Sequence, residues 1–176
     1  MKNTLLLTLV LAGLAGCATL TPDQCKTADW LDLGRRDGQR GYSPDRIAEH
    51  SEACSKAGVG VNAALWRQGW REGVRSYCVP RVAWREGAAN NSYNGACHDL
   101  DEPNFLRWYR LGQDVYKTRQ QRDSTRSEMN RTENELKKAE KDEDRKRLRE
   151  KLRQLDSEQS RLRRLLETLE AGEPRN

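Results

Sequence analysis

The chain has 176 residues and a formal net charge of +5 at pH 7, and 34% of its side chains are charged. The basic excess lies in residues 117–176, which carry 18 basic and 14 acidic side chains, whereas residues 17–116 carry 13 of each. An excess of +4 in the tail is too small to indicate a nucleic-acid-binding protein, so no nucleic acid is expected as a partner. After the N-terminal residues, no stretch of the sequence is apolar enough to cross a bilayer as a helix.

The first residues predict export and lipidation. An apolar run from Leu5 to Leu14 has the length of a signal-peptide core and is too short to span a bilayer. It ends in the letters LAGC, which resemble the lipobox of bacterial lipoproteins. That resemblance implies cleavage before Cys17 and acylation of this residue, with palmitate among its chains. Because Ala18 follows, it also implies sorting to the outer membrane. The alternative is an ordinary secretory signal with an incidental cysteine.

Composition divides the mature chain into two units. All five Trp and all five Tyr precede residue 117, and the rest of the chain consists mainly of charged residues, Gln and Leu. A compact head of this size buries a modest core and often needs covalent cross-links. The expected organisation is a signal peptide at 1–16, a lipidated linker at 17–26, a helical head at 27–116, a charged helical hairpin or coiled coil at 117–171 and a disordered C-terminus at 172–176.

Capping residues, glycines and prolines mark the helix boundaries of the head. In chain order they predict helices at 27–40, 44–57 and 62–77, a short turn at 82–86, and a long helix that begins near Pro103. The stretch AANNSYNG before the long helix is expected to be a polar loop. Since no segment has a convincing strand pattern, the expected fold class is all-α.

The segment GRRDGQRG, residues 34–41, has three glycines but not the spacing of a phosphate-binding loop, and no strand precedes it. Its pattern recurs 35 residues later, and a shorter unit, aromatic-Arg-x-Gly, occurs four times. On a helix this spacing aligns rings and glycines in one stripe, and a glycine without a Cβ lets a neighbouring helix approach closely. Close helix packing is therefore expected at Gly34, Gly38, Gly69, Gly73, Gly87 and Gly112.

Four cysteines follow Cys17, and an even number in an exported chain argues for two disulfides. The sequence alone allows three pairings. The first two expected helices are joined by a very short turn and therefore run nearly antiparallel, which brings Cys25 close to Cys54. The pair that remains is Cys78 and Cys97. The expected bonds are Cys25–Cys54 and Cys78–Cys97.

The tail carries two heptad seams that do not join. One runs from Leu111 to Ala139 and the other from Leu148 to Leu169, and the intervening letters EKDEDRK contain no apolar residue. We therefore expect a turn there, with Asp142 or Asp144 capping the second helix, and an antiparallel helical hairpin. The alternative is one continuous helix with a phase break.

Residues 25–116 resemble a family of small proteobacterial lipoproteins that is defined by a domain of unknown function. The resemblance implies no particular activity, and the tail lies outside it. It rests on the spacing of glycines, cysteines and aromatic residues, namely Cys25, Asp29, Trp30, Gly34, Asp37, Gly38, Gly41, His50, Cys54, Gly69, Gly73, Tyr77, Cys78, Gly87, Tyr93, Cys97 and Gly112.

Each of the two histidines that follow Cys17 lies near a cysteine in the sequence. His50 precedes Cys54 by four residues, and His98 directly follows Cys97. With reduced cysteines, these four side chains are suited to copper or zinc. With disulfides, the histidines are incidental, and this is the interpretation that we prefer. No cofactor is therefore expected, and metal binding is the alternative.

Four acidic residues recur near Arg and Trp in the head, at Asp29, Asp37, Glu72 and Glu86. A glycosidase needs two carboxylates that face each other across a cleft. These four lie in repeated helical units and are expected to form ion pairs with Arg. An envelope hydrolase is thus a lesser alternative, and the chain is not expected to be an enzyme.

These patterns predict a lipid-anchored outer-membrane lipoprotein on the periplasmic face that acts as a structural or interaction module. The expected partners are the membrane, through the N-terminal acyl chains, and a protein or a second copy of the chain, through the helical tail. The alternative is a periplasmic metal-binding lipoprotein.

Overall fold

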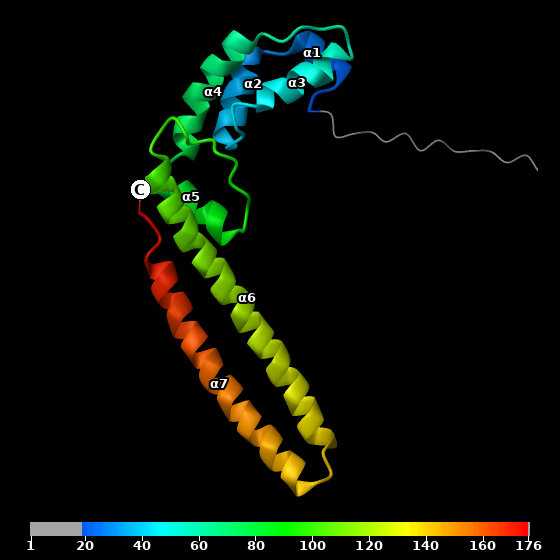
Figure 1. Cartoon of the computed structure of the whole chain (residues 1–176), viewed down its shortest axis with the longest axis vertical. Coiled ribbons are helices and arrows are strands. Elements are labelled where there is room, and N and C mark those ends of the chain that lie inside the picture. The colour runs from blue at the N-terminus through cyan, green and yellow to red at the C-terminus, as the bar shows by residue number, and fades with distance from the viewer. Residues whose placement is uncertain (1–18, 176) are drawn as a thin grey trace, which may run out of the picture.

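A computed structural model describes residues 19–175, and Figure 1 shows their arrangement. They form seven α-helices, in agreement with the expected all-α class. A head of short helices lies at one end of an elongated molecule, and two long helices extend from it side by side. Within residues 19–175, no helix is both long and apolar enough to cross a membrane. The predicted signal peptide and Cys17 lie outside the described residues.

The N-terminal part of the head differs from the expected helix at 27–40. Helix α1 (Pro22–Thr27) occupies part of the expected linker, and its N-terminus has a capping box between Thr21 and Gln24. Helix α2 (Trp30–Gln39) is separate, and its N-terminus is capped by Asp29. Two short helices therefore replace the single expected one, because the chain is extended at Ala28 between them.

The next three helices lie close to their expected positions. Helix α3 (Arg46–Ser55) begins two residues after the expected start, because residues 44–45 form a turn. Helix α4 (Ala63–Tyr77) has the expected bounds, with the Asn62 side chain accepting a bond from the Leu65 amide. The expected turn at 82–86 is wrong, since Pro80 begins a full helix, α5 (Pro80–Ala88).

The tail forms the expected antiparallel hairpin of α6 (Glu102–Lys138) and α7 (Asp142–Ala171) (Figure 1). The expected cap at Asp142 or Asp144 is wrong, because both residues lie in the first turn of α7. There their carboxylates face the positive end of the helix dipole. Val115 and Thr132 of α6, with Leu148 and Leu162 of α7, are buried along the seam between the two helices.

Helices α2 and α4 touch backbone to backbone through four glycines. A Cβ atom placed on Gly34 would overlap the carbonyl oxygen of Trp66, and one on Gly38 would lie 2.6 Å from the Val74 amide nitrogen. Conversely, a Cβ on Gly69 would lie 2.8 Å from the Leu31 carbonyl carbon. Residue numbers rise together along both helices, so they run in the same direction at a distance that only glycine permits.

Helices α5 and α6 cross in the same reciprocal way. A Cβ on Gly87 would overlap the Tyr109 carbonyl oxygen, and one on Gly112 would lie 2.8 Å from the Ala88 nitrogen. In each glycine pair of both crossings, every glycine meets the carbonyl three residues before the partner helix's glycine. The aromatic-Arg-x-Gly unit thus marks these contacts, because the aromatic residue supplies that carbonyl in four of the six.

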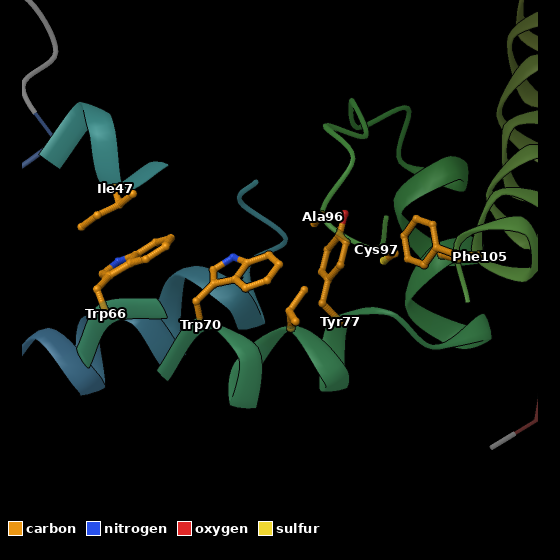
Figure 2. Close-up of a cluster of buried hydrophobic side chains, with 9 residues drawn as sticks. Ile47, Trp66, Trp70, Tyr77, Ala96, Cys97 and Phe105 are labelled. Carbon is orange, nitrogen blue, oxygen red and sulfur yellow. The ribbon is translucent and has the colours of Figure 1, made fainter. Parts of the chain in front are cut away.

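A row of aromatic side chains connects the two crossings (Figure 2). Trp66, Trp70 and Tyr77 follow one another along α4, and the Tyr77 ring stacks on Phe105 of α6 with 5.4 Å between ring centroids. The Trp70 indole nitrogen donates to the Tyr42 carbonyl at 2.8 Å. Burial is the main cause that raises the pKa of the Tyr77 hydroxyl to about 12. This continuous core joins the head to the base of the hairpin.

Two disulfides join the expected cysteines. Cys25 of α1 bonds Cys54 of α3, and Cys78 after α4 bonds Cys97 before α6, with Cα–Cα distances of 5.5 and 5.6 Å. All except Cys78 are fully buried. Since disulfides persist in oxidising environments, the two bonds indicate a compartment outside the cytoplasm.

Candidate functional site

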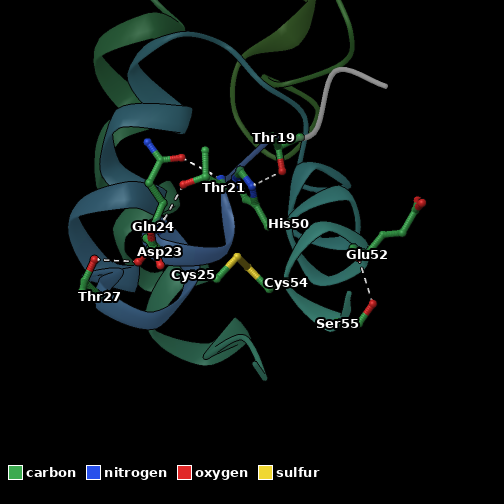
Figure 3. Close-up of a disulfide and its surroundings, with 10 residues drawn as sticks. All are labelled: Thr19, Thr21, Asp23, Gln24, Cys25, Thr27, His50, Glu52, Cys54 and Ser55. Atoms are coloured by element: carbon green, nitrogen blue, oxygen red, sulfur yellow. Dashed lines mark hydrogen bonds between the residues drawn. A yellow bond between two sulfur atoms is a disulfide. The ribbon is translucent and has the colours of Figure 1, made fainter. Parts of the chain in front are cut away.

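A buried polar network holds the N-terminal segment of the described chain against the head. The Asp37 carboxylate oxygen Oδ2 accepts bonds from Trp66 Nε1 at 2.9 Å and from His50 Nε2 at 2.8 Å. The other ring nitrogen of His50, Nδ1, lies 2.7 Å from the Thr19 hydroxyl (Figure 3). Asp37 and His50 are 3% and 1% exposed. Thr19, two residues after the predicted lipidation site, is thereby fixed to α3.

Replacing Asp37 by alanine is expected to lower the free energy of unfolding by about 2 kcal/mol, because two buried N–H donors lose their acceptor. Asp37→Asn keeps one acceptor oxygen and should cost less. The control is Glu52→Ala, which removes an exposed pair with Lys56 and should change stability by at most about 0.5 kcal/mol. Urea titrations of the mature chain measure all three, and equal values for Asp37→Ala and Glu52→Ala would contradict a structural role for the network.

The four acidic residues considered for a hydrolase do not face one another across a cleft. Each has a separate structural partner, and Asp37 contacts His50 and Trp66 instead of the expected Arg. Of the four, only Glu72 makes an ion pair with an Arg of another helix, Arg35, at 3.0 Å. Asp29 caps α2, and Glu86 accepts a bond from the Asn91 side chain at 2.8 Å.

The four residues of the alternative metal site do not form a ligand cluster within the described residues. The sulfur atoms of Cys54 and Cys97 are in disulfides. Both ring nitrogens of His50 have hydrogen-bond partners, and His98 is exposed beside Asp99. Among residues 19–175, no group of three or more His, Cys, Asp or Glu side chains could hold a metal ion.

A surface groove lies at the base of the hairpin. A groove of about 910 Å³, here called the Trp108 groove, opens between the start of α5, α6 and the C-terminal segment. Five apolar and three basic residues line it, namely Val79, Pro80, Val82, Trp108, Pro174, Arg81, Arg85 and Arg175. A smaller depression of about 370 Å³ adjoins it, and Glu170 and Glu173 line that depression.

The Trp108 groove was not foreseen from the sequence, because three segments far apart in the chain form its walls. The expected helix at 62–77 and turn at 82–86 leave Val79 and Pro80 between them, and the expected C-terminus at 172–176 is disordered. In the structure, Pro80 begins α5, and residues 172–175 follow the end of α7 back past α5. The guanidinium of Arg107 lies over the Trp108 ring at 5.0 Å from its centroid.

Comparison with known proteins identifies the domain that carries both glycine crossings. Residues 29–114 match a family model described as a protein of unknown function (DUF2799). These residues are a DUF2799 domain. No curated protein and no solved structure matches the chain.

The DUF2799 domain begins at Asp29, the cap of α2, and ends within α6 at Asp114. It contains all six packing glycines and the whole Cys78–Cys97 disulfide. The Cys25–Cys54 bond joins it to α1, which precedes the matched region. The Trp108 groove lies at its edge, because most of the groove belongs to the DUF2799 domain whereas Pro174 and Arg175 come from the tail.

Proposed function

We propose that the chain is an outer-membrane lipoprotein whose DUF2799 head lies at the periplasmic face and whose hairpin contacts a protein partner or a second copy. Two observations support the proposed location. The sequence around Cys17 resembles a lipobox, and the two disulfides suit an oxidising compartment.

The observation that carries the proposed role is the placement of the two ends of the molecule. Helix α1 and the turn of the hairpin lie at opposite ends (Figure 1). Thr19 is bound to His50, and two further residues reach back at most about 7 Å to Cys17. Anchoring at Cys17 would therefore hold the head against the membrane. Helix α6, about 55 Å long at 1.5 Å per residue, would direct the hairpin away from it.

The surface of the hairpin is suited to a protein contact. Within α6 and α7, the exposed large apolar side chains are Leu111 and Leu165, whereas Val115, Leu148, Leu162 and Leu166 are buried. Charged residues cover the outer faces, and some pair between the helices, such as Lys151 with Glu128 at 2.7 Å. This favours recognition of a partner through charge complementarity over insertion into a bilayer.

The role is tested by placing a photo-activated cross-linking residue at Gln154, an exposed position on α7, in intact cells. A discrete cross-linked product is expected, and its mass distinguishes a second copy from another protein. The matched control is Gln68, which is also exposed and lies on α4 of the head. Equal products from both positions, or none from Gln154, would contradict a contact made by the hairpin.

The anchor is tested separately by Cys17→Ser. This variant should lose acyl labelling and leave the membrane fraction or accumulate as the precursor, because no acyl chain can then be attached. Fractionation with the outer membrane at the wild-type level would contradict the lipoprotein proposal without affecting the cross-linking result.

A further inference from the structure

We propose that the Trp108 groove binds an extended acidic peptide segment of a protein partner. This site is distinct from the outer face of the hairpin, and its chemistry can be derived from its walls. The proposal concerns the junction between the DUF2799 domain and the tail, where both contribute lining residues.

The charge of the walls favours an acidic ligand. Three of the eight lining residues are arginines, and none of those described is acidic. The Arg85 side chain is 68% exposed, and its pairing carboxylate, Glu86, is 3.7 Å away, which is longer than a hydrogen bond. Its guanidinium therefore has N–H donors available to a carboxylate, in the planar geometry that such groups recognise.

The apolar part of the groove favours a ligand that carries apolar groups as well as negative charge. Val79 is 36% exposed and lies with Pro80, Val82 and the half-buried Trp108 in the same groove. The volume of about 910 Å³ is near the upper end of ordinary ligand sites. A ligand that fills it must bring apolar side chains to these walls as well as carboxylates to the arginines.

The shape of the groove favours an extended peptide. Residues 173–175 of the chain itself have no helical structure, and Pro174 and Arg175 form one wall, so an extended backbone already fits beside α5. Successive side chains of an extended segment point to opposite sides. A segment in which acidic and apolar residues alternate would place carboxylates toward Arg85 and Arg175 and apolar groups toward Trp108.

Anionic lipid headgroups are a less suitable ligand because of where the groove lies. Trp66, at the start of α4, belongs to the network that holds Thr19, whereas the groove begins at Val79, just beyond the end of α4. The part of α4 from Trp66 to Tyr77 spans about 17 Å at 1.5 Å per residue. This argument about the membrane rests on the proposed anchoring at Cys17. Binding of a peptide in solution does not depend on that anchoring.

The test uses the full mature chain and a fluorescent hexapeptide of alternating Glu and Leu, with a Gln-for-Glu peptide as the neutral counterpart. Saturable binding of the acidic peptide is expected, with at least about tenfold weaker binding of the neutral peptide. Arg85→Gln should weaken binding of the acidic peptide about fivefold. Arg67→Gln, which removes another exposed charge, on α4, should leave the affinity unchanged.

Three results would overturn the proposal. They are the absence of saturable binding, equal affinity for the acidic and neutral peptides, and equal losses in Arg85→Gln and Arg67→Gln. Vesicles containing anionic lipid provide a further comparison. Binding to them that depends on Arg85, together with no binding of the acidic peptide, would assign the groove to lipid headgroups instead.

Discussion

Replacing Gly73 by alanine is expected to destabilise the head by about 3 kcal/mol or more, the upper range for overpacking a close contact. The added methyl carbon would overlap the Arg35 carbonyl oxygen and lie 2.8 Å from its carbonyl carbon. Both atoms are backbone, so the strain can be relieved only by moving α2 away from α4. Helix propensity alone predicts the opposite sign, with alanine more stable than glycine by about 1 kcal/mol.

The matched control is Gly60→Ala, since Gly60 lies in a loop and a Cβ added there meets no atom within 4 Å. Urea unfolding of the two variants and the wild type shows whether Gly73→Ala lowers or raises the free energy of unfolding. If Gly73→Ala were as stable as the wild type or more so, the close contact between α2 and α4 would be wrong.

Removal of the Cys25–Cys54 bond by a double substitution to alanine is expected to cost about 3–4 kcal/mol, because the unfolded chain regains the freedom of the closed loop. The bond closes a sequence separation of 29 residues. It also fixes α1 and the segment that carries Thr19 to α3. The double variant should therefore become more sensitive to proteases near residues 19–27, in addition to unfolding at lower urea concentration.

Peptide mapping without reductant tests the pairing itself. The expected products are linked peptides that contain Cys25 with Cys54 and Cys78 with Cys97. A peptide that links Cys25 to Cys97, or Cys54 to Cys78, would contradict the structure. Four free thiols that take up copper would restore metal binding as an explanation for these residues.

The helices and their glycine contacts were largely predictable, because both depend on local patterns. Asn62 caps the expected helix, and the aromatic-Arg-x-Gly unit contains four of the six glycines that meet a neighbouring backbone. The capping box formed by Thr21 and Gln24 is also recognisable in the sequence, and it predicts the start of α1. The aromatic-Arg-x-Gly pattern does not predict which helices pair, because a stripe of glycines on one helix does not identify the helix that packs against it.

The candidate sites were harder to predict, because they depend on tertiary proximity. Asp37 has arginines beside it in the sequence, yet its partners are His50 and Trp66 from two other helices. The Trp108 groove likewise needs the tail to fold back, so that Arg175 lies near Arg81. Neither of these two contacts can be derived from residue spacing, because the paths of the loops and the crossing of the helices bring the residues together.

The reciprocal glycine contacts make the head sensitive to insertions and deletions as well as to substitutions. Gly34 and Gly38 each sit against a carbonyl of α4, so the two contacts must recur on the same side of α2. One residue inserted between them would rotate the second glycine by about 100° and present a side chain to the opposing carbonyl. The close contact therefore depends on the exact number of residues between the two glycines. Residues on the faces of α2 and α4 that point away from the contact are not subject to this constraint.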